Sequence, residues 1–323
     1  MDYKVIPLDH GQIPAFVDHC LEVFQSRASR SYFESHIYDD PESLSNLSSI
    51  LVVITETGSI VAGLRVLRRR QYFHSSIRVT SGLAEVSTKS SHRKRGLASS
   101  LIAAAISGPL QAGSLALFHT NFSKLGDFYG GHGFRSIPHQ YARFQLSNRS
   151  PVANIATSGP CGAMVELDLS SNAIAHDAMT LYDTVCRQYN GPVCRDLAYF
   201  QTWVVNRLRR VESIRVRAVF GDRLLGYVFG NQIDDDQVEI EELIVSGNDY
   251  DVAIQLLSAV STPGQYLRLP LPILLDLQLS DQGVCIEQDH GFMYRPMPRC
   301  DDVSWERYFN HPDRNVFWTT DSF

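Results

Sequence analysis

The sequence SSHRKRGLASSLIAAAI occupies residues 90–106 and joins two unlike parts. A basic cluster, Arg93 to Arg95, is followed by Gly96 and then by small and aliphatic residues, a pattern that predicts a helix over about residues 94–106. Positive charge is disfavoured at the N-terminus of a helix, because the free backbone N–H groups there already make the field positive. We therefore expect an anionic partner at this turn.

The spacing of this turn indicates which anion it suits. Arg93, Gly96 and Ala98 form the pattern R-x-x-G-x-A, in which a residue without a side chain lets backbone N–H groups approach an anion closely. A pyrophosphate fits this description, and further basic residues are available for another phosphate: Lys89, His92, Lys94 and Arg95. No Walker A pattern G-x-x-x-x-G-K-[ST] is present, and only one glycine of the Rossmann pattern G-x-G-x-x-G is in place.

Length, charge and cysteine usage limit the class of protein. The 323 residues suffice for two domains, and the net charge of −6 gives no general attraction to nucleic acid or an anionic membrane. The six cysteines form no C-x-x-C pair and no Cys/His set with zinc spacing, so we expect no metal. The first residues do not resemble a signal peptide, and no apolar run approaches the roughly 20 residues of a membrane span. We expect a cytoplasmic protein without nucleic-acid or membrane partners.

A polar segment over residues 147–162 contains two prolines and two glycines and predicts a linker. The expected domains are residues 1–146 and 163–296, followed by a tail over 297–323. The first has the pattern of a mixed α/β domain with a central sheet. Its expected elements are a helix over 12–25, strands over 49–56, 60–67 and 82–88, the helix over 94–106, a strand over 114–120, a helix over 125–132 and a strand over 141–146.

The second half of the chain repeats features of the first. A tripeptide and a strand recur at an offset of 158 residues, and a hairpin recurs at an offset of 163: His132-Gly133-Phe134 with His290-Gly291-Phe292, residues 84–86 with 242–244, and residues 58–63 with 221–226. One tripeptide alone could arise by chance, but the three together indicate a duplication. We therefore expect two copies of one fold.

The two copies differ where chemistry is expected. At the offset of 158 the basic, glycine and hydroxyl positions are lost: Arg93 becomes Asp251, Gly96 becomes Ile254 and Tyr129 becomes Glu287. Residues that the same scaffold can lack are not needed for folding. The first copy is therefore expected to carry the chemistry, and the second to be degenerate.

Two segments resemble a known family. LAEVSTKSSHRKRGLASSLI, residues 83–102, resembles the acetyl-CoA loop of the GCN5-related N-acetyltransferases, and FYGGHGF, residues 128–134, resembles their later F-Y-x-x-x-G-F segment. Asn121 lies where the family often has an asparagine. The motifs cover residues 1–146, whereas residues 163–296 resemble the family only as a fold. The tandem arrangement is similar to that of Eis-type acetyltransferases, and it implies two GNAT-like α/β domains, the second degenerate.

The resemblance implies a role for each motif residue. The strand at Val86 and Thr88 would separate from its neighbour and pair with the pantetheine arm of acetyl-CoA. The residues expected to contact the cofactor are Val86, Thr88, Arg93, Lys94, Arg95, Gly96, Ala98, Ser99 and Asn121. An amine would attack the thioester directly, with the Val86 backbone N–H stabilising the oxyanion and Tyr129 protonating the departing thiolate.

The amine is protonated at neutral pH, so a base must accept its proton. Glu85 is the nearest carboxylate in sequence, but strand parity points it to the face opposite Val86 unless a bulge intervenes. A second candidate is the terminal carboxylate of Phe323, because Eis-type enzymes are similar in ending at a carboxylate that enters the active site.

Plainer roles stay open for several residues. The basic cluster could be a solvated surface, Tyr129 a core aromatic residue and Asn121 a turn residue. Three other groups are expected to be structural or solvated: the histidines His119, His132 and His139, the strand end Arg68 to Arg70, and the turn Asp234 to Asp236.

The sequence thus predicts an N-acetyltransferase that uses acetyl-CoA and a primary amine of a small molecule or peptide. The alternatives are a longer acyl-CoA, a hydroxyl acceptor, or a non-catalytic module that binds acyl-CoA or a partner. The second copy and the tail are expected to cap the acceptor cleft or to form a homodimer surface.

Overall fold

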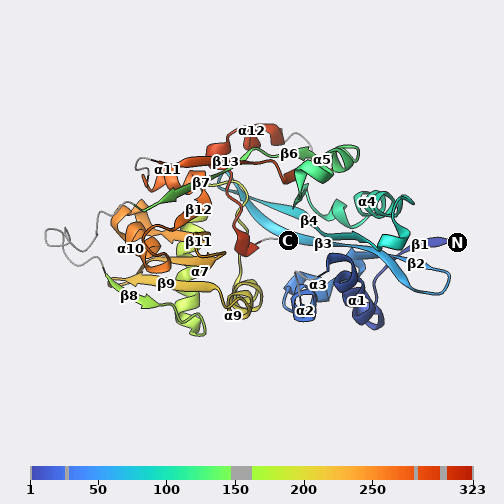
Figure 1. Ribbon diagram of the computed structural model, residues 1–323, viewed down its shortest axis with the longest axis horizontal. Coiled ribbons are helices and arrows are strands. Elements are labelled where there is room, and N and C mark those ends of the chain that lie inside the picture. Colours follow the sequence, from blue (N-terminus) through green and yellow to red (C-terminus); the bar gives the residue numbers. More distant parts are fainter. Residues whose placement is uncertain (1, 26–28, 147–161, 280–282, 299–303, 322–323) are drawn as a thin grey trace.

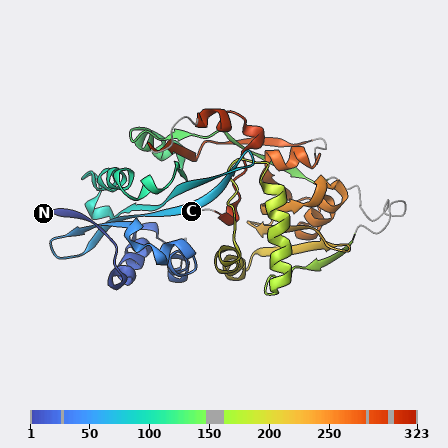
Figure 2. The same ribbon diagram turned by 180° about the vertical axis from the view of Figure 1, so that it is seen from behind.

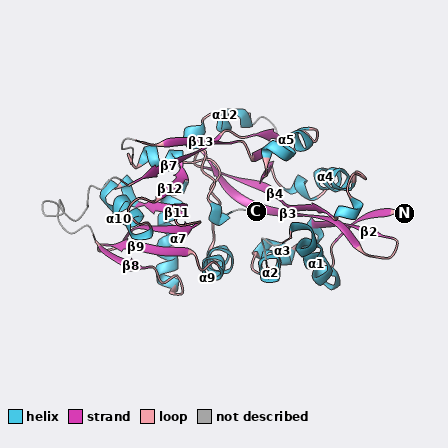
Figure 3. Ribbon diagram, viewed as in Figure 1, coloured by secondary structure: helices cyan, strands magenta, loops and turns pink. Residues whose placement is uncertain are grey.

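The computed structural model describes residues 2–25, 29–146, 162–279, 283–298 and 304–321. Two mixed seven-stranded sheets lie end to end along the long axis, with helices on their faces (Figures 1 and 3). The first sheet has the order β1 (Tyr3–Pro7), β2 (Ile50–Thr55), β3 (Ile60–Phe73), β4 (Ser76–Thr88), β5 (Leu115–His119), β14 (Phe292–Pro296), β6 (Arg135–Ser136). The second has the order β8 (Ala163–Glu166), β9 (Ile214–Phe220), β10 (Leu224–Gln232), β11 (Gln237–Val245), β12 (Tyr266–Pro270), β7 (His139–Gln145), β13 (Cys285–Asp289).

The two sheets exchange one strand each. β7 lies between β12 and β13 of the second sheet, and β14 lies between β5 and β6 of the first. All pairings are antiparallel except β4 with β5 and β11 with β12. The sheets therefore do not divide at the expected boundary, although the domain limits themselves stay a prediction. Most of the expected linker lies outside the described residues.

The helices follow the same order in both halves. The first half has α1 (Ile13–Phe24), α2 (Arg30–Tyr38), α3 (Pro41–Ser45), α4 (Leu97–Ser107) and α5 (Phe122–Gly130). The second has α7 (Asn172–Cys186), α8 (Leu197–Tyr199), the π-helix Phe200–Val205, α9 (Asn206–Arg210), α10 (Tyr250–Val260), α11 (Leu271–Asp276) and α12 (Trp305–Phe309). Short 3-10 turns cover His10–Gln12, Leu47–Ser49, Ser90–His92, Pro109–Ala112, Ser246–Asn248, Pro312–Arg314 and Thr319–Asp321.

Alternate residues of β2 explain the layers of the first half. Ile50 and Val52 pack against α1 and α2, whereas Leu51 and Val53 pack against α4. The strand is a continuous apolar run because both of its faces are covered. The first sheet therefore separates α1 to α3 from α4 and α5 (Figure 1).

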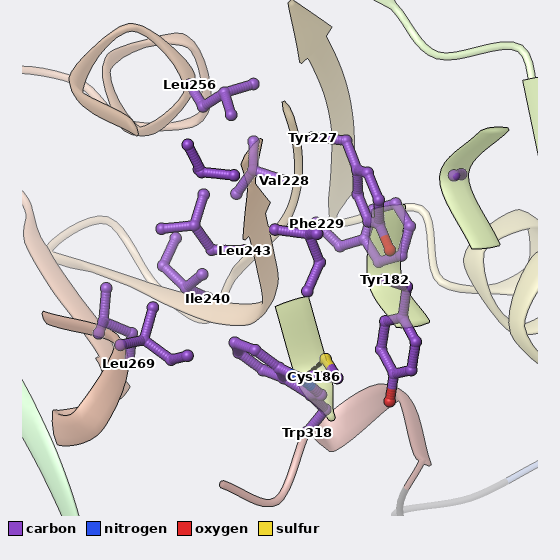
Figure 4. Close-up of a cluster of buried hydrophobic side chains, with 14 of the residues drawn as sticks. Tyr182, Cys186, Tyr227, Val228, Phe229, Ile240, Leu243, Leu256, Leu269 and Trp318 are labelled. Atoms are coloured by element: carbon purple, nitrogen blue, oxygen red, sulfur yellow. Dashed lines mark hydrogen bonds between the residues drawn. The ribbon is translucent and has the colours of Figure 1, made fainter. Parts of the chain in front are cut away.

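The core of the second half is built in the same way. Along β10, Tyr227 and Phe229 lie on the side of α7, while Val228 points toward Leu256 of α10 (Figure 4). Helix α7 crosses the face of the sheet that is seen in Figure 2. The C-terminal segment completes this core, because the Trp318 indole N–H donates a hydrogen bond to the Cys186 sulfur, 3.4 Å away.

The order of strands in the two sheets is similar, as the predicted duplication requires, but the structure corrects the constant offset. Helices α4 and α10 occupy equivalent places, so the counterpart of the N-cap Gly96 is the N-cap Asp249 rather than Ile254. Gly133 and Gly283 each precede an equivalent strand by two residues and have φ values of +81° and +103°. The recurring tripeptide at Gly291 instead lies between β13 and β14, because loop lengths differ between the copies.

Most predicted elements of the first half are present. The amphipathic helix expected over residues 12–25 is α1, and the hairpin around Gly58 joins β2 to β3. β1, α2 and α3 were not predicted. Asp234 to Asp236 are confirmed as an exposed turn, here between β10 and β11.

The expectation that Arg68 to Arg70 form an exposed strand end is wrong for Arg69. β3 continues to Phe73, and Arg69 lies on its α2–α3 side, 4% exposed. Its guanidinium pairs with Asp40 at 2.5 Å and lies over the ring of Tyr199 at 5.1 Å. β3 is therefore longer than its apolar run, and it buries the charge of Arg69, which the sequence alone places in solvent.

Acid is expected to destabilise the fold through His139 of β7. The ring is fully buried against Tyr141, Phe292 and Phe317, and burial lowers the pKa of His139 to about 3. The unfolded chain binds this proton near pH ~6.5, so stability is complete above that pH and falls as pH drops toward 3. At pH 4.5 the loss is on the order of 2 kcal/mol.

Urea denaturation of a His139→Phe variant checks this effect. We expect the variant to lose less unfolding free energy than the wild type between pH 7 and pH 4.5. The same change at the exposed His176 is expected to leave the pH dependence as it is. Equal losses in wild type and His139→Phe would contradict the assignment.

Candidate active site

The β4 and β5 strands separate part-way along their length. Their parallel pairing runs only from Thr80–Leu115 to Gly82–Leu117, although β4 continues to Thr88 and stays paired with β3. A backbone edge on β4 is thus left without its neighbour, which is the separation expected at Val86 and Thr88. An extended chain can pair with such an edge as an added strand would.

The N-terminus of α4 points into this opening. Gly96 is the N-cap residue with φ +77°, no side chain caps the helix, and Lys94 also has a positive φ of +61°. A Cβ added at Gly96 would meet no atom within 4 Å. The loop therefore presents free N–H groups of the first helical turn to an open space, an arrangement that suits an anion.

A groove of about 820 Å³ brings these features together. Eight of the nine residues expected to contact the cofactor line it: Val86, Thr88, Arg93, Lys94, Gly96, Ala98, Ser99 and Asn121. The ninth, Arg95, does not, because its guanidinium hydrogen-bonds the Tyr3 hydroxyl at 2.7 Å. Sequence reasoning missed the groove wall that α1 and α5 supply: Val23, Phe24, Lys124, Leu125 and Phe128.

Asn121 lines the groove and is also a cap residue. Its side-chain oxygen accepts a hydrogen bond from the Lys124 backbone N–H at 3.2 Å and so begins α5. The two roles that the sequence left open for Asn121 are therefore compatible.

Tyr129 of α5 does not line the groove but lies in the core next to it, in the same cluster as the partly buried groove residues Val86 and Phe128. The ring is 4% exposed and packs against Phe118 of β5 at 4.5 Å. Burial raises the pKa of Tyr129 to about 12, although a hydrogen bond with Thr120 acts in the opposite direction. The hydroxyl therefore keeps its proton at neutral pH, beside the residue that directly follows β5.

Glu85 occupies a β-bulge in β4. The pairing with β3 steps from Gly63–Ser87 to Arg65–Ala84, and Glu85 has φ +48°. Its carboxylate nevertheless lies on the α2 side of the sheet, away from the groove. It accepts bonds from Arg65 Nε at 2.6 Å and contacts His36 Nδ1 at 2.5 Å.

These partners make Glu85 a poor proton acceptor. The pKa of Glu85 is lowered far below its usual range by Arg65 and His36, against the effect of burial. Sequence reasoning missed both partners, because they come from α2 and β3 and meet Glu85 only in the folded sheet. Phe323, the other base expected from the sequence, lies outside the described residues.

Comparison with known proteins gives this groove its context. A sequence model of the acetyltransferase (GNAT) domain matches residues 4–137, the part that contains β4, α4 and Tyr129. Over residues 4–137 the chain is similar to a GNAT acetyltransferase domain. No curated protein sequence matches the chain.

Solved structures extend the GNAT fold to the second half. A GCN5-related N-acetyltransferase from Kribbella flavida covers 92% of this chain with 73% of its own, at TM-score 0.67 and 15% identity. A probable N-acyltransferase from Enterococcus faecalis gives the same coverage, at TM-score 0.70 and 14% identity. Eis1 from Mycobacterium abscessus covers 92% with 74% of its own chain, at TM-score 0.65 and 12% identity. At these identities the likeness shows the fold.

The second GNAT-like half lacks an open anion site at the equivalent helix. The Asp249 carboxylate accepts bonds from the backbone N–H groups of Asp251 and Val252, at 3.0 and 3.2 Å, where Gly96 leaves such groups uncapped. Asp251 adds a second negative charge in the same turn. Both carboxylates would repel a phosphate, which accounts physically for a degenerate copy.

Two negative findings concern the described part of the GNAT-like chain. Within it, no cluster of three or more His, Cys, Asp or Glu side chains could hold a metal ion. None of its helices is both long and apolar enough to pass through a membrane.

Proposed function

We propose that the first domain binds acetyl-CoA along the groove and transfers the acetyl group to a primary amine of a small molecule or peptide. One observation carries the proposal. A single groove holds the free edge of β4, the uncapped N-terminus of α4 and the basic loop before it. An extended pantetheine arm needs a free strand edge, and a pyrophosphate needs free backbone N–H groups and positive charge. Because acetyl-CoA joins the two groups, their partners must lie at a fixed separation.

Each groove residue then has a role that follows from its chemistry. The backbone N–H groups of Ala98 and Ser99 hold the pyrophosphate, while the side chains of Arg93 and Lys94 add positive charge. Arg95 contributes its backbone, since its side chain is held by Tyr3. Val86 and Thr88 pair with the pantetheine arm, and Asn121, at the start of α5, borders it.

The chemical step takes place where β4 and β5 separate. The Val86 backbone N–H stabilises the oxyanion that forms when the amine attacks the thioester carbonyl. Tyr129 donates its proton to the departing thiolate. The raised pKa of Tyr129 keeps the hydroxyl protonated for this step. Glu85 is not the base, because its carboxylate is held by Arg65 and His36. It acts as a positioning residue within the bulge of β4.

A thiol-release assay tests this function and its rivals. Acetyl-CoA is offered with a panel of primary amines, alcohols and short peptides, and products are identified by mass. We expect acetylated amines. Faster thiol release with a longer acyl-CoA would identify that acyl-CoA as the donor. Faster thiol release with an alcohol would identify a hydroxyl group as the acceptor. Binding of acetyl-CoA without any release would favour a non-catalytic module. A cytoplasmic location and a homodimer stay expectations of this proposal.

A further inference from the structure

A second hollow lies where the two sheets come together. This cavity of about 500 Å³ is bordered by both sheets and by the C-terminal segment. Its lining residues are Gln71, His119, Tyr141, Gly191, Ile233, Gln237, Glu239, Arg268, Asp289, Phe292, Phe317, Trp318, Thr319 and Asp321. Because the lining comes from both halves of the chain, the cavity exists only in the tandem arrangement.

The cavity and the groove share no lining residue, but residues at the end of β5 bring them close together in the chain. Phe118 packs against Tyr129 on the groove side, and the next residue, His119, points to the opposite face and lines the cavity. Two residues later, Asn121 lines the groove. β4 and β5 have already separated after Gly82–Leu117, so β4 no longer pairs with the end of β5 at His119.

His119 forms a pair with a carboxylate at this junction. Its Nε2 lies 3.1 and 3.4 Å from the two carboxylate oxygens of Asp289. Asp289 is itself fixed by the Gly291 backbone N–H, which donates to it at 2.7 Å. A Cβ at Gly291 would come within 2.5 Å of His119 Nε2, so this glycine lets the imidazole approach. With its Nε2–H donated to Asp289, His119 has Nδ1 left to accept a proton.

We propose that this cavity holds the acceptor, a primary amine on an aromatic or similarly flat apolar body, and that His119, oriented by Asp289, takes the proton of the amine. The proposal rests on the proposed function. It supplies a base that neither Glu85 nor the described part of the tail provides.

The walls of the cavity indicate this class of acceptor. Phe292 and Phe317 stack with ring centroids 4.4 Å apart, and Tyr141 and Trp318 add further aromatic surface. Of the three carboxylates that border the cavity, Glu239 is paired with Arg268 and Asp321 with Arg195, whereas the ionic partner of Asp289 is His119. Carboxylates and aromatic faces together favour a cation on an apolar body.

The charged groups around His119 come from three strands. Asp289 belongs to β13, and behind it lie the buried His139 of β7 and Arg268 of β12. Arg268 is compensated by Glu239 at 2.7 Å and Glu287 at 2.8 Å. Asp289 is thus the charged group in direct contact with the His119 imidazole.

The alternative histidine, His36, is placed less well. It contacts Glu85 in a similar way but is only 8% exposed and lines neither hollow. The side chain of His119 is 52% exposed and borders the cavity directly.

The protons and electrons of the step balance. His119 takes one proton from the ammonium and releases it to solvent. The nitrogen lone pair then forms the C–N bond, the C–S bond breaks, and its electron pair leaves on sulfur. Tyr129 gives its proton to the thiolate, and the second proton lost by nitrogen restores the Tyr129 hydroxyl. The products are the amide, CoA thiol and one released proton.

The pH profile of a His119→Gln variant tests the base. With 2-phenylethylamine as acceptor, we expect kcat at neutral pH to fall about 30-fold, less than the ~10² of full general-base catalysis because water also takes the proton. The loss should shrink at high pH, where the amine is itself neutral. Asp289→Asn should change the profile in the same direction but less, and the exposed His176→Gln should not. A wild-type profile in His119→Gln would overturn the role of His119.

A binding experiment tests the cavity without turnover. 2-Phenylethylamine is titrated into the protein saturated with CoA. We expect Ile233→Lys, at the exposed cavity rim, to weaken its affinity about tenfold, and the equally exposed Ile286→Lys on β13 to leave it unchanged. Equal affinities in the two variants would overturn the cavity. Failure of the proposed function would give a different result from failure of the cavity assignment. No amine would then cause thiol release, whether or not 2-phenylethylamine binds.

Discussion

Replacing Gly96 by glutamate is expected to weaken acetyl-CoA binding on the order of 10³-fold, about 4 kcal/mol. Two effects add. Residue 96 has φ +77°, which a side chain adopts only with strain. In addition, a Cβ there meets no protein atom within 4 Å, so the new carboxylate extends into the groove, where we place the pyrophosphate. Like charges at that distance repel strongly.

The second half of the chain supplies a matched control for this variant. Gly247 has φ +64°, lies just before the equivalent helix α10 and is also free of contacts within 4 Å. Gly247→Glu thus carries the same strain and charge without facing the groove. Thermal stabilisation by acetyl-CoA should be lost in Gly96→Glu and retained in Gly247→Glu. Equal stabilisation of both variants would mean that the cofactor binds elsewhere.

Tyr129→Phe is expected to lower kcat on the order of 10²-fold and to leave acetyl-CoA affinity nearly unchanged. The ring is retained, so its packing against Phe118 persists, and only the hydroxyl is removed. Burial raises the pKa of Tyr129 to about 12, so the wild-type hydroxyl is a proton donor throughout the neutral range.

Tyr189→Phe is the control for the loss of a buried hydroxyl. Tyr189 is also buried, and its hydroxyl donates to Asp276 at 2.6 Å, far from the groove. Steady-state kinetics should show kcat reduced only in Tyr129→Phe. If both variants turned over like wild type, Tyr129 would be a core aromatic residue and nothing more.

The groove could be predicted from sequence because its chemistry is local. Gly96 and the basic residues before it lie within one turn, and their pattern depends on backbone geometry rather than on distant contacts. The same holds for Tyr129, whose place follows from the spacing of one short helix. Periodicity likewise located β2, α1 and α4 to within a few residues.

Features that depend on distant parts of the chain were beyond prediction. The exchange of β7 and β14 leaves no local signal, because the sheet that each strand joins is decided by partners far away in the sequence. Glu85 was considered as a base without regard to Arg65 and His36, because these two residues contact it only in the folded protein. His119 was expected to be structural because it has no metal-ligand spacing, and its partner, Asp289, lies 170 residues away in the sequence.

The constant offset failed for a related reason. It aligned Gly96 with Ile254, whereas the fold aligns it with Asp249, whose side chain caps its own helix. The degenerate second copy stays a prediction, and the residue from which it was argued was the wrong one. The physical distinction is an open helix N-terminus in one copy and a filled, acidic one in the other.

Calorimetric titration of acetyl-CoA into the wild-type protein tests the central claim most directly. The account predicts binding at one site per chain, since only the first domain has an uncapped α4 facing the free edge of β4. Two equivalent sites per chain would contradict the degeneracy of the second copy. Absence of any binding would contradict the assignment of the groove itself.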